Sequence, residues 1–124
     1  MAKYFNKEDR HWSPANVRGL GVEKLSLWNE GFDIESALFR MKKGMTIERH
    51  THHHWVQVVV IEGEMQIESE KDGVVHVSEG GCYFLTPGVT HTEQSMQDSI
   101  VLVTQMHYHP DYPSQSAKPE VSVL

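Results

Sequence analysis

Residues 48–63 read ERHTHHHWVQVVVIEG, a cluster of imidazoles followed directly by an apolar segment. Four of the nine histidines stand at residues 50–54, and four valines and an isoleucine lie within the next seven residues. Because β-branched residues favour strands, this stretch predicts a buried strand that begins beside several histidines. Imidazole is a common metal ligand, so a metal site at the mouth of a sheet is the first hypothesis.

The spacing of these histidines decides which of them can share an ion. Adjacent side chains on a strand point to opposite faces, so His50 and His52 lie on one face while Thr51 and His53 lie on the other. The Cβ atoms of the alternate pair would be about 7 Å apart, which two imidazoles can close on one metal at roughly 2.0–2.1 Å. His54 shares their parity but lies about 13 Å from His50 on a straight strand, so it joins only if the backbone bends.

Outward from this stretch, the chain after residue 16 predicts an all-β fold. Short strand-like segments are separated by Gly, Asn-Glu, Lys-Asp-Gly and Pro-Gly turns, without a helical apolar period. Their close spacing is typical of an antiparallel sandwich or barrel. We expect an N-terminal arm at 1–16, a barrel at 17–112 and a C-terminal tail at 113–124. The predicted strands are 21–27, 34–42, 55–61, 64–69, 74–77, 82–85 and 100–108.

Length and composition exclude several classes of protein. A chain of 124 residues is long enough for one ordinary domain. Its net charge of −6 and lack of clustered basic residues argue against nucleic acid as a partner. No apolar run is long enough to span a bilayer, and the N-terminus does not resemble a secretory signal. With one cysteine, Cys82, the chain forms no intrachain disulfide, and we expect a cytoplasmic protein.

A third histidine is needed to hold a catalytic metal, and His91 is the obvious candidate. It ends the stretch GGCYFLTPGVTH, in which an apolar strand is followed by a Pro-Gly turn that could fold the histidine back. His107 and His109 form a second alternate pair, but this pair has no evident third partner. Histidines can also simply be solvated, and a lone His-x-His carries little information.

Two stretches of the chain resemble the two motifs of the cupin superfamily. GMTIERHTHHHWVQVVVIEG at 44–63 is similar to the first motif: Gly, five residues, His-x-His, three or four residues, Glu or Gln, about six residues, Gly. GCYFLTPGVTH at 81–91 is similar to the second. Both motifs in the right order are a far more specific signal than either alone. The short single-domain cupins of pectin and uronate catabolism are the nearest in character.

This resemblance implies a jelly-roll fold, the antiparallel double-stranded β-helix, with one divalent metal inside the barrel. The implied ligands are His50, His52, His91 and a carboxylate or amide from the first motif. Gln57 has the longer of the allowed spacings after the His-x-His pair, and we expect it to be the fourth ligand. With His, His, His and Gln as neutral ligands, the ion would keep its full +2 charge.

The position of the fourth ligand is ambiguous in this sequence. Counting back from Gly63, the motif places the ligand at Val56, which also has the inward parity of the histidines. A β-bulge near Trp55 would bring Gln57 inward instead. Without a bulge, His54 or water would complete the coordination.

The expected function is that of a small metal-dependent enzyme acting on a polar substrate such as a sugar acid or an oxo or enol compound. Isomerase or lyase chemistry and dioxygenase chemistry use the same protein ligands, so both remain open. The metal could be Fe, Ni, Mn, Co, Cu or Zn. Tyr108, Gln105 and Glu93 are weak candidates for the group that moves a proton. The alternative is a non-enzymatic module that binds a small ligand or a metal, and in either case we expect a homodimer.

Overall fold

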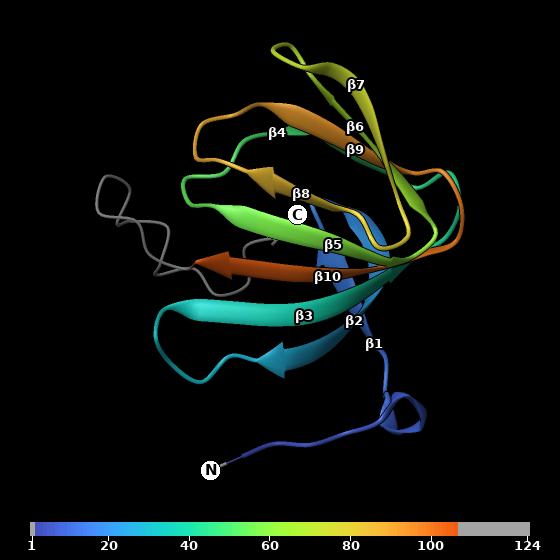
Figure 1. Cartoon of the computed structure of the whole chain (residues 1–124), viewed down its shortest axis with the longest axis vertical. Coiled ribbons are helices and arrows are strands. Elements are labelled where there is room, and N and C mark those ends of the chain that lie inside the picture. Colours follow the sequence, from blue (N-terminus) through green and yellow to red (C-terminus); the bar gives the residue numbers. More distant parts are fainter. Residues whose placement is uncertain (1, 107–124) are drawn as a thin grey trace.

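The computed structural model describes residues 2–106, which form two antiparallel sheets that face each other (Figure 1). One short 3-10 helix, η1 (Lys7–Asp9), precedes the strands and is the only helical element among residues 2–106. The strands are β1 (Ser13–Val17), β2 (Leu20–Trp28), β3 (Ile34–Met41), β4 (Thr46–His50), β5 (Val56–Glu62), β6 (Glu64–Ser69), β7 (Gly73–Ser78), β8 (Cys82–Leu85), β9 (His91–Ser95) and β10 (Ser99–Met106).

The order of the strands confirms the predicted jelly roll. The larger sheet has the order β1-β2-β3-β10-β5-β8, and the smaller sheet has the order β4-β9-β6-β7. From β3 onward the chain passes repeatedly between the two sheets, so strands distant in sequence become neighbours, such as β3 with β10 and β4 with β9. Every strand pair is antiparallel, as expected for a double-stranded β-helix.

The hydrophobic core fills the space between the sheets. Side chains of β5 and β10 alternate between a buried face and a more exposed face. The buried face of β5 carries three valines, and that of β10 carries two valines between Ser99 and Gln105. Each such valine contributes about 1.5–3 kcal/mol when it is fully buried. The core consists of Val17, Val22, Ala37, Phe39, Met41, Ile47, Val56, Val58, Val60, Met65, Ile67, Leu85, Val101 and Val103.

Three strands were not expected from the sequence. β1 lies mostly within the segment predicted as an arm, and it pairs with β2 across a turn in which Arg18 (φ 50) and Gly19 (φ 88) both adopt positive φ. β4 and β9 read TIERH and HTEQS, too polar to be recognised as strands. Several of their inward positions carry polar side chains, including histidines, where an ordinary core strand would carry valine or leucine.

The end of the predicted barrel, the predicted tail and the last two residues of the predicted strand at 100–108 lie outside the described residues. Within residues 2–106, no helix has the length and apolar character needed to cross a membrane.

Candidate metal centre

His50 is turned into the barrel by an irregularity in β4. Ile47 and His50 are both buried although they are three residues apart, a spacing that puts side chains on opposite faces of a regular strand. The pairing of β4 with β9 shifts register between these two residues, as a β-bulge does. After the shift, His50 stands directly opposite His91 on the neighbouring strand.

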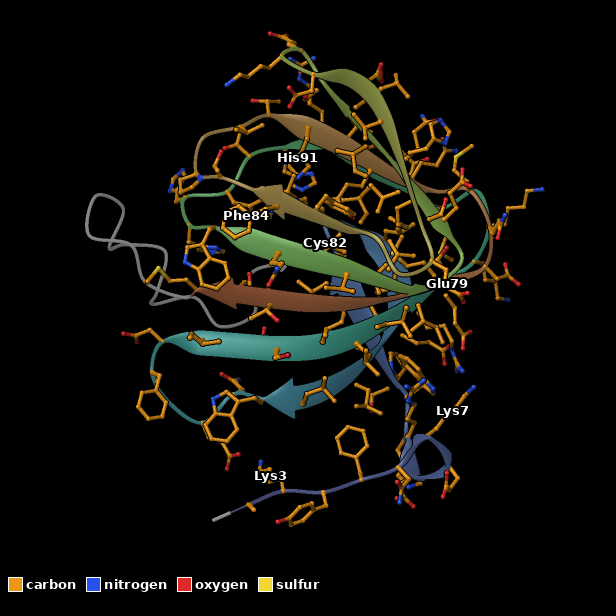
Figure 2. All side chains as sticks on the ribbon, in the orientation of Figure 1. Lys3, Lys7, Glu79, Cys82, Phe84 and His91 are labelled. Atoms are coloured by element: carbon orange, nitrogen blue, oxygen red, sulfur yellow. The ribbon has the colours of Figure 1, made fainter. Side chains whose placement is uncertain are left out.

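His91 is placed by the Pro-Gly turn that precedes it. Gly88 has a φ of 84°, a conformation that favours glycine, and Val89 N donates to Thr86 O across the turn at 3.3 Å. Gly88 N also donates to His52 O at 2.9 Å, so the turn is tied to the histidine-rich segment. Figure 2 labels His91 on β9, where its side chain is buried between the sheets.

The structure brings His50, His52 and His91 together. All three side chains are buried, and one potential ligand atom from each lies within 4.8 Å of the others. Their ring centroids are 4.2 Å apart for His50 and His91, 4.9 Å for His50 and His52, and 5.2 Å for His52 and His91. The Nε2 atom of each ring is buried without a hydrogen-bond partner. Such atoms are costly unless a cation binds them, and three imidazole nitrogens are a common ligand set for transition metals.

Backbone carbonyl groups determine which nitrogen of two rings carries the proton. His50 Nδ1 lies 2.5 Å from Glu48 O, and His91 Nδ1 lies 3.1 Å from Val89 O. Because a carbonyl oxygen only accepts, each Nδ1 donates, and the neutral ring presents a lone pair at Nε2. Hydrogen bonds of this kind orient metal-binding histidines in known metal sites.

Burial disfavours the charged form of two of the imidazoles. It is the main cause that lowers the pKa of His50, and together with the neighbouring histidines it lowers the pKa of His52 to about 2. The positive charge of Arg18 is a smaller cause that also lowers the pKa of His50 and the pKa of His52. The Arg18 guanidinium therefore lies close enough to act electrostatically on the histidines. Arg18, in the β1–β2 turn, donates from a guanidinium nitrogen to Thr51 O at 3.3 Å.

A buried carboxylate lies beside the histidines. Glu93 is fully buried, and its Oε1 atom lies 3.1 Å from His91 Nε2 and 3.6 Å from His50 Nε2. Its Oε2 atom accepts a hydrogen bond from Tyr83 Oη at 2.5 Å. Burial, followed by the charge of Glu93, raises the pKa of Tyr83, so this phenol stays protonated and donates. Glu93 was only a weak candidate in the sequence, whereas the structure places its carboxylate beside two of the three histidines, His50 and His91.

Gln57 does not reach the histidines, contrary to the prediction. It lies between the inward-facing Val56 and Val58, so its side chain is on the outer face of β5, where Nε2 lies 3.6 Å from Cys82 Sγ. The pairings of β5 with β8 and β10 continue without a shift at this end of the strand. The bulge that would have brought Gln57 inward is therefore absent from this end of β5, and the irregularity lies in β4 instead.

The remaining candidates lie elsewhere. His54 is buried with its ring centroid 5.9 Å from that of His52, but it is not part of the group of three. Gln105 faces the barrel interior and donates to Glu35 Oε1 at 3.0 Å, so it belongs to a different polar contact. Tyr108, like the alternate pair at 107 and 109, lies outside the described residues.

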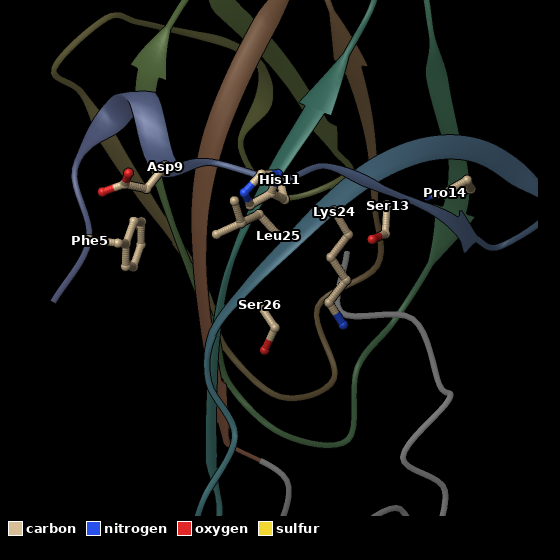
Figure 3. A pocket seen from close by; sticks show the side chains of 8 residues that line it. All are labelled: Phe5, Asp9, His11, Ser13, Pro14, Lys24, Leu25 and Ser26. Carbon is tan, nitrogen blue, oxygen red and sulfur yellow. The ribbon is translucent and has the colours of Figure 1, made fainter. Parts of the chain in front are cut away.

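Two surface hollows differ in their relation to this cluster. One, of about 360 Å³, lies between β7 and β8 and is lined in part by Val75, Tyr83, Phe84 and His91, so it reaches the wall of the site. The other, of about 520 Å³, lies between the N-terminal segment and β2 (Figure 3). Because none of the three clustered histidines lines the second hollow, we treat it as separate from the candidate metal centre.

Comparisons with known proteins agree with this architecture. A family model described as the ChrR cupin-like domain matches residues 2–109. The chain resembles the solved structure of KdgF from a Halomonas species, with a TM-score of 0.71 and 16% identity over 88% of this chain and 98% of that one. It also resembles a predicted oxalate decarboxylase from Thermotoga maritima, with a TM-score of 0.72 and 17% identity over 84% and 98% of the two chains.

A third similar structure is an RmlC-like cupin from Shewanella frigidimarina, with a TM-score of 0.68 and 21% identity over 90% of this chain and 96% of that one. At such identities the likeness establishes the fold. No functionally curated protein matches the chain.

Proposed function

The chain belongs to the family of ChrR cupin-like domains, and we propose that it is a metal-dependent enzyme acting on a small anionic substrate. The observation that carries this proposal is the convergence of three buried, unpartnered Nε2 atoms from His50, His52 and His91. The ion is a divalent transition metal, one of Fe, Ni, Mn, Co, Cu and Zn. We place the protein in the cytoplasm, in keeping with its single, unpaired cysteine.

The residues around the site suggest how such a substrate is handled. When bound, the ion polarises a carbonyl or enediolate oxygen of the substrate. The carbonyl groups of Glu48 and Val89 hold two of the imidazoles in the ligating tautomer. The apolar barrel wall limits access of water. Arg18 supplies a positive charge near the ligand set, which favours a substrate with a carboxylate, such as a sugar acid or an oxo acid.

The reaction is isomerisation or elimination on such a substrate, or its oxidation by dioxygen at a ferrous ion. The second candidate function is a non-enzymatic module that holds a metal or small ligand. It is favoured by the number of inward-facing side chains able to ligate one ion, because an ion surrounded by protein ligands has few positions for a substrate.

The first experiment is metal analysis of the purified protein, followed by reloading of the stripped protein with each candidate metal. We expect one ion per chain, and loss of the ion in His52→Ala and His91→Ala. His53→Ala is the matched control, because His53 is exposed and does not belong to the group of three histidines. Retention of a full equivalent of metal by either of the first two variants would show that the ligands are wrongly assigned.

The second experiment separates the enzyme from the binding module. The metal-loaded protein is incubated with a panel of uronates, oxo acids and enediols, with and without dioxygen, and products are followed by NMR. Turnover that disappears in His91→Ala supports the enzyme. Metal binding without turnover of any compound supports the module.

We also propose that the protein is a homodimer. Val74 and Val75 on β7 and Phe84 on β8 are exposed apolar side chains on strands at the sheet edges. Trp55 stacks on Phe84 with ring centroids 5.7 Å apart, extending this apolar surface. Exposed edge strands of this kind are commonly covered by a second copy.

A further inference from the structure

We propose that Glu93 is the fourth protein ligand of the metal, in place of the side chain that the first motif would supply. This inference rests on the proposed metal centre and assigns one more of its ligands. Glu93 follows His91 by two residues on β9, so both side chains point to the same inner face. The carboxylate therefore comes from the strand of the second motif, not from that of the first.

The first motif offers no oxygen ligand in this fold. Val56 occupies the inward position expected for the ligand, and it is fully buried and apolar. Gln57, the other candidate, lies on the outer face beside Cys82. With three histidines alone the site would lack a carboxylate, and Glu93 is a buried acidic side chain that contacts two of them, His50 and His91.

The distances around Glu93 fit joint coordination of one ion. Two donor atoms that bind one metal at about 2.0–2.2 Å lie roughly 2.9–3.5 Å apart at tetrahedral or octahedral angles. Glu93 Oε1 lies 3.1 Å from His91 Nε2 and 3.6 Å from His50 Nε2, close to this range for these two pairs. Glu93 is outside the group of three histidines whose ligand atoms lie within 4.8 Å of one another, so its side chain must move toward His52 for all four to bind one ion. The same Oε1 atom is buried and has no hydrogen-bond partner.

A hydrogen bond from a neutral imidazole does not account for this contact. His91 donates from Nδ1 to Val89 O, so its Nε2 presents a lone pair toward the carboxylate oxygen. The same argument applies to His50, whose Nδ1 donates to Glu48 O. Lone pairs of buried atoms at this separation repel one another unless a metal cation or a proton lies between them.

Tyr83 leaves one carboxylate oxygen for the metal. Its hydroxyl donates to Glu93 Oε2 at 2.5 Å, and this holds Oε1 toward the histidines. Tyr83 is therefore a positioning residue, which contacts the ligand without contacting the ion. Hydrogen-bond partners of ligands typically change metal affinity by about 10–100-fold.

The assignment changes the chemistry expected from the sequence. Three neutral imidazoles and one carboxylate reduce the net charge of the centre from +2 to +1, in contrast to the neutral set with Gln57. Four protein ligands leave two positions on a six-coordinate ion such as Fe, Ni, Mn or Co, and none on four-coordinate Zn. A substrate that binds through two of its oxygen atoms therefore requires a six-coordinate metal at this centre.

The test is cobalt binding by the whole chain, measured by chelator competition and by the visible absorption spectrum of the bound ion. Glu93→Gln and Glu93→Ala are compared with the wild type, with Tyr83→Phe, and with Glu68→Gln as control. Glu68 is exposed on the neighbouring strand β6, opposite Thr92. We expect both Glu93 variants to bind cobalt more than about 100-fold more weakly, with an altered spectrum. Tyr83→Phe should lose less affinity, and Glu68→Gln should match the wild type.

Cobalt affinity within about threefold of the wild type in Glu93→Gln would overturn the inference. So would weaker binding with an unchanged cobalt spectrum, since this indicates an effect of charge without a bond. Glu93→Gln keeps the size of the side chain and serves if Glu93→Ala does not fold. If the wild-type protein binds no cobalt or other metal, the proposed metal centre fails and the ligand assignment fails with it.

Discussion

The pKa of His52 predicts that the metal-free protein loses stability at acidic pH. The folded-state pKa of His52 is lowered to about 2, whereas an unfolded chain has the ordinary value of about 6.5. Between these values the unfolded chain binds more protons than the folded one, so stability falls as the pH decreases. The contribution is complete above the unfolded-state pKa and decreases by about 1.4 kcal/mol for each pH unit below it.

Between pH 7 and pH 5, His52 alone should therefore cost about 2 kcal/mol of unfolding free energy. The pKa of His50 is also lowered by burial, so its contribution has the same sign. For a domain of this length, 2 kcal/mol corresponds to a decrease in Tm of roughly 6–10 °C. The assay is thermal unfolding of the metal-free protein by circular dichroism at the two pH values.

Other groups also titrate between pH 5 and pH 7. The contribution of His52 is therefore isolated by comparing the pH-dependent loss of stability in variants and in the wild type. His52→Gln removes the titrating ring while keeping a polar side chain, and it should reduce the pH-dependent loss by about 2 kcal/mol. His53→Gln changes an exposed neighbour and should leave the loss unchanged. An equal loss in the wild type and in His52→Gln would refute the link between the burial of this ring and acid sensitivity.

Three further predictions concern the turn at Gly63, the basic side chain at the site and the oligomer. Gly63→Ala should lower stability by about 1–3 kcal/mol in urea unfolding, because the new Cβ would lie 2.3 Å from Ser99 Oγ at a φ of +90°. Gly80→Ala has a similar φ of +85° with nothing within 4 Å, so it should cost less, and an equal cost would contradict the steric account. Arg18→Gln should raise the KM for an anionic substrate about tenfold or more with a smaller change in kcat. Arg40→Gln should not, because Arg40 is exposed on β3 and paired with Glu23. Light scattering should give twice the chain mass of 14.2 kDa, and a monomer at micromolar concentration would count against the dimer.

The fold was largely predictable because β5 and β10 follow simple alternation. Val56, Val58 and Val60 face inward at every second position, and this pattern is visible in the sequence. β4 and β9 were not predicted, because His50, His91 and other polar residues occupy inward positions where a strand normally carries apolar ones. Strands whose inward positions carry polar side chains are therefore missed when strands are predicted from hydrophobic patterns.

The site was predictable in part. The three histidines could be selected by parity and by the two motifs, and the structure brings them together. The β4 bulge that turns His50 inward could not be anticipated, because a register shift depends on pairing with β9, which lies about forty residues further along the chain. Glu93 was undervalued because a glutamate at a strand end is usually solvated. Its contacts with His91 and Tyr83 arise only in the folded chain.

The proposed metal centre requires one cation bound between His50, His52 and His91. It is tested by a crystal structure of the cobalt-loaded protein, with anomalous scattering recorded at the cobalt absorption edge. We expect a single strong anomalous peak about 2.0–2.2 Å from the Nε2 atoms of all three histidines. An anomalous peak at any other position, with these three nitrogens uncoordinated, would contradict it.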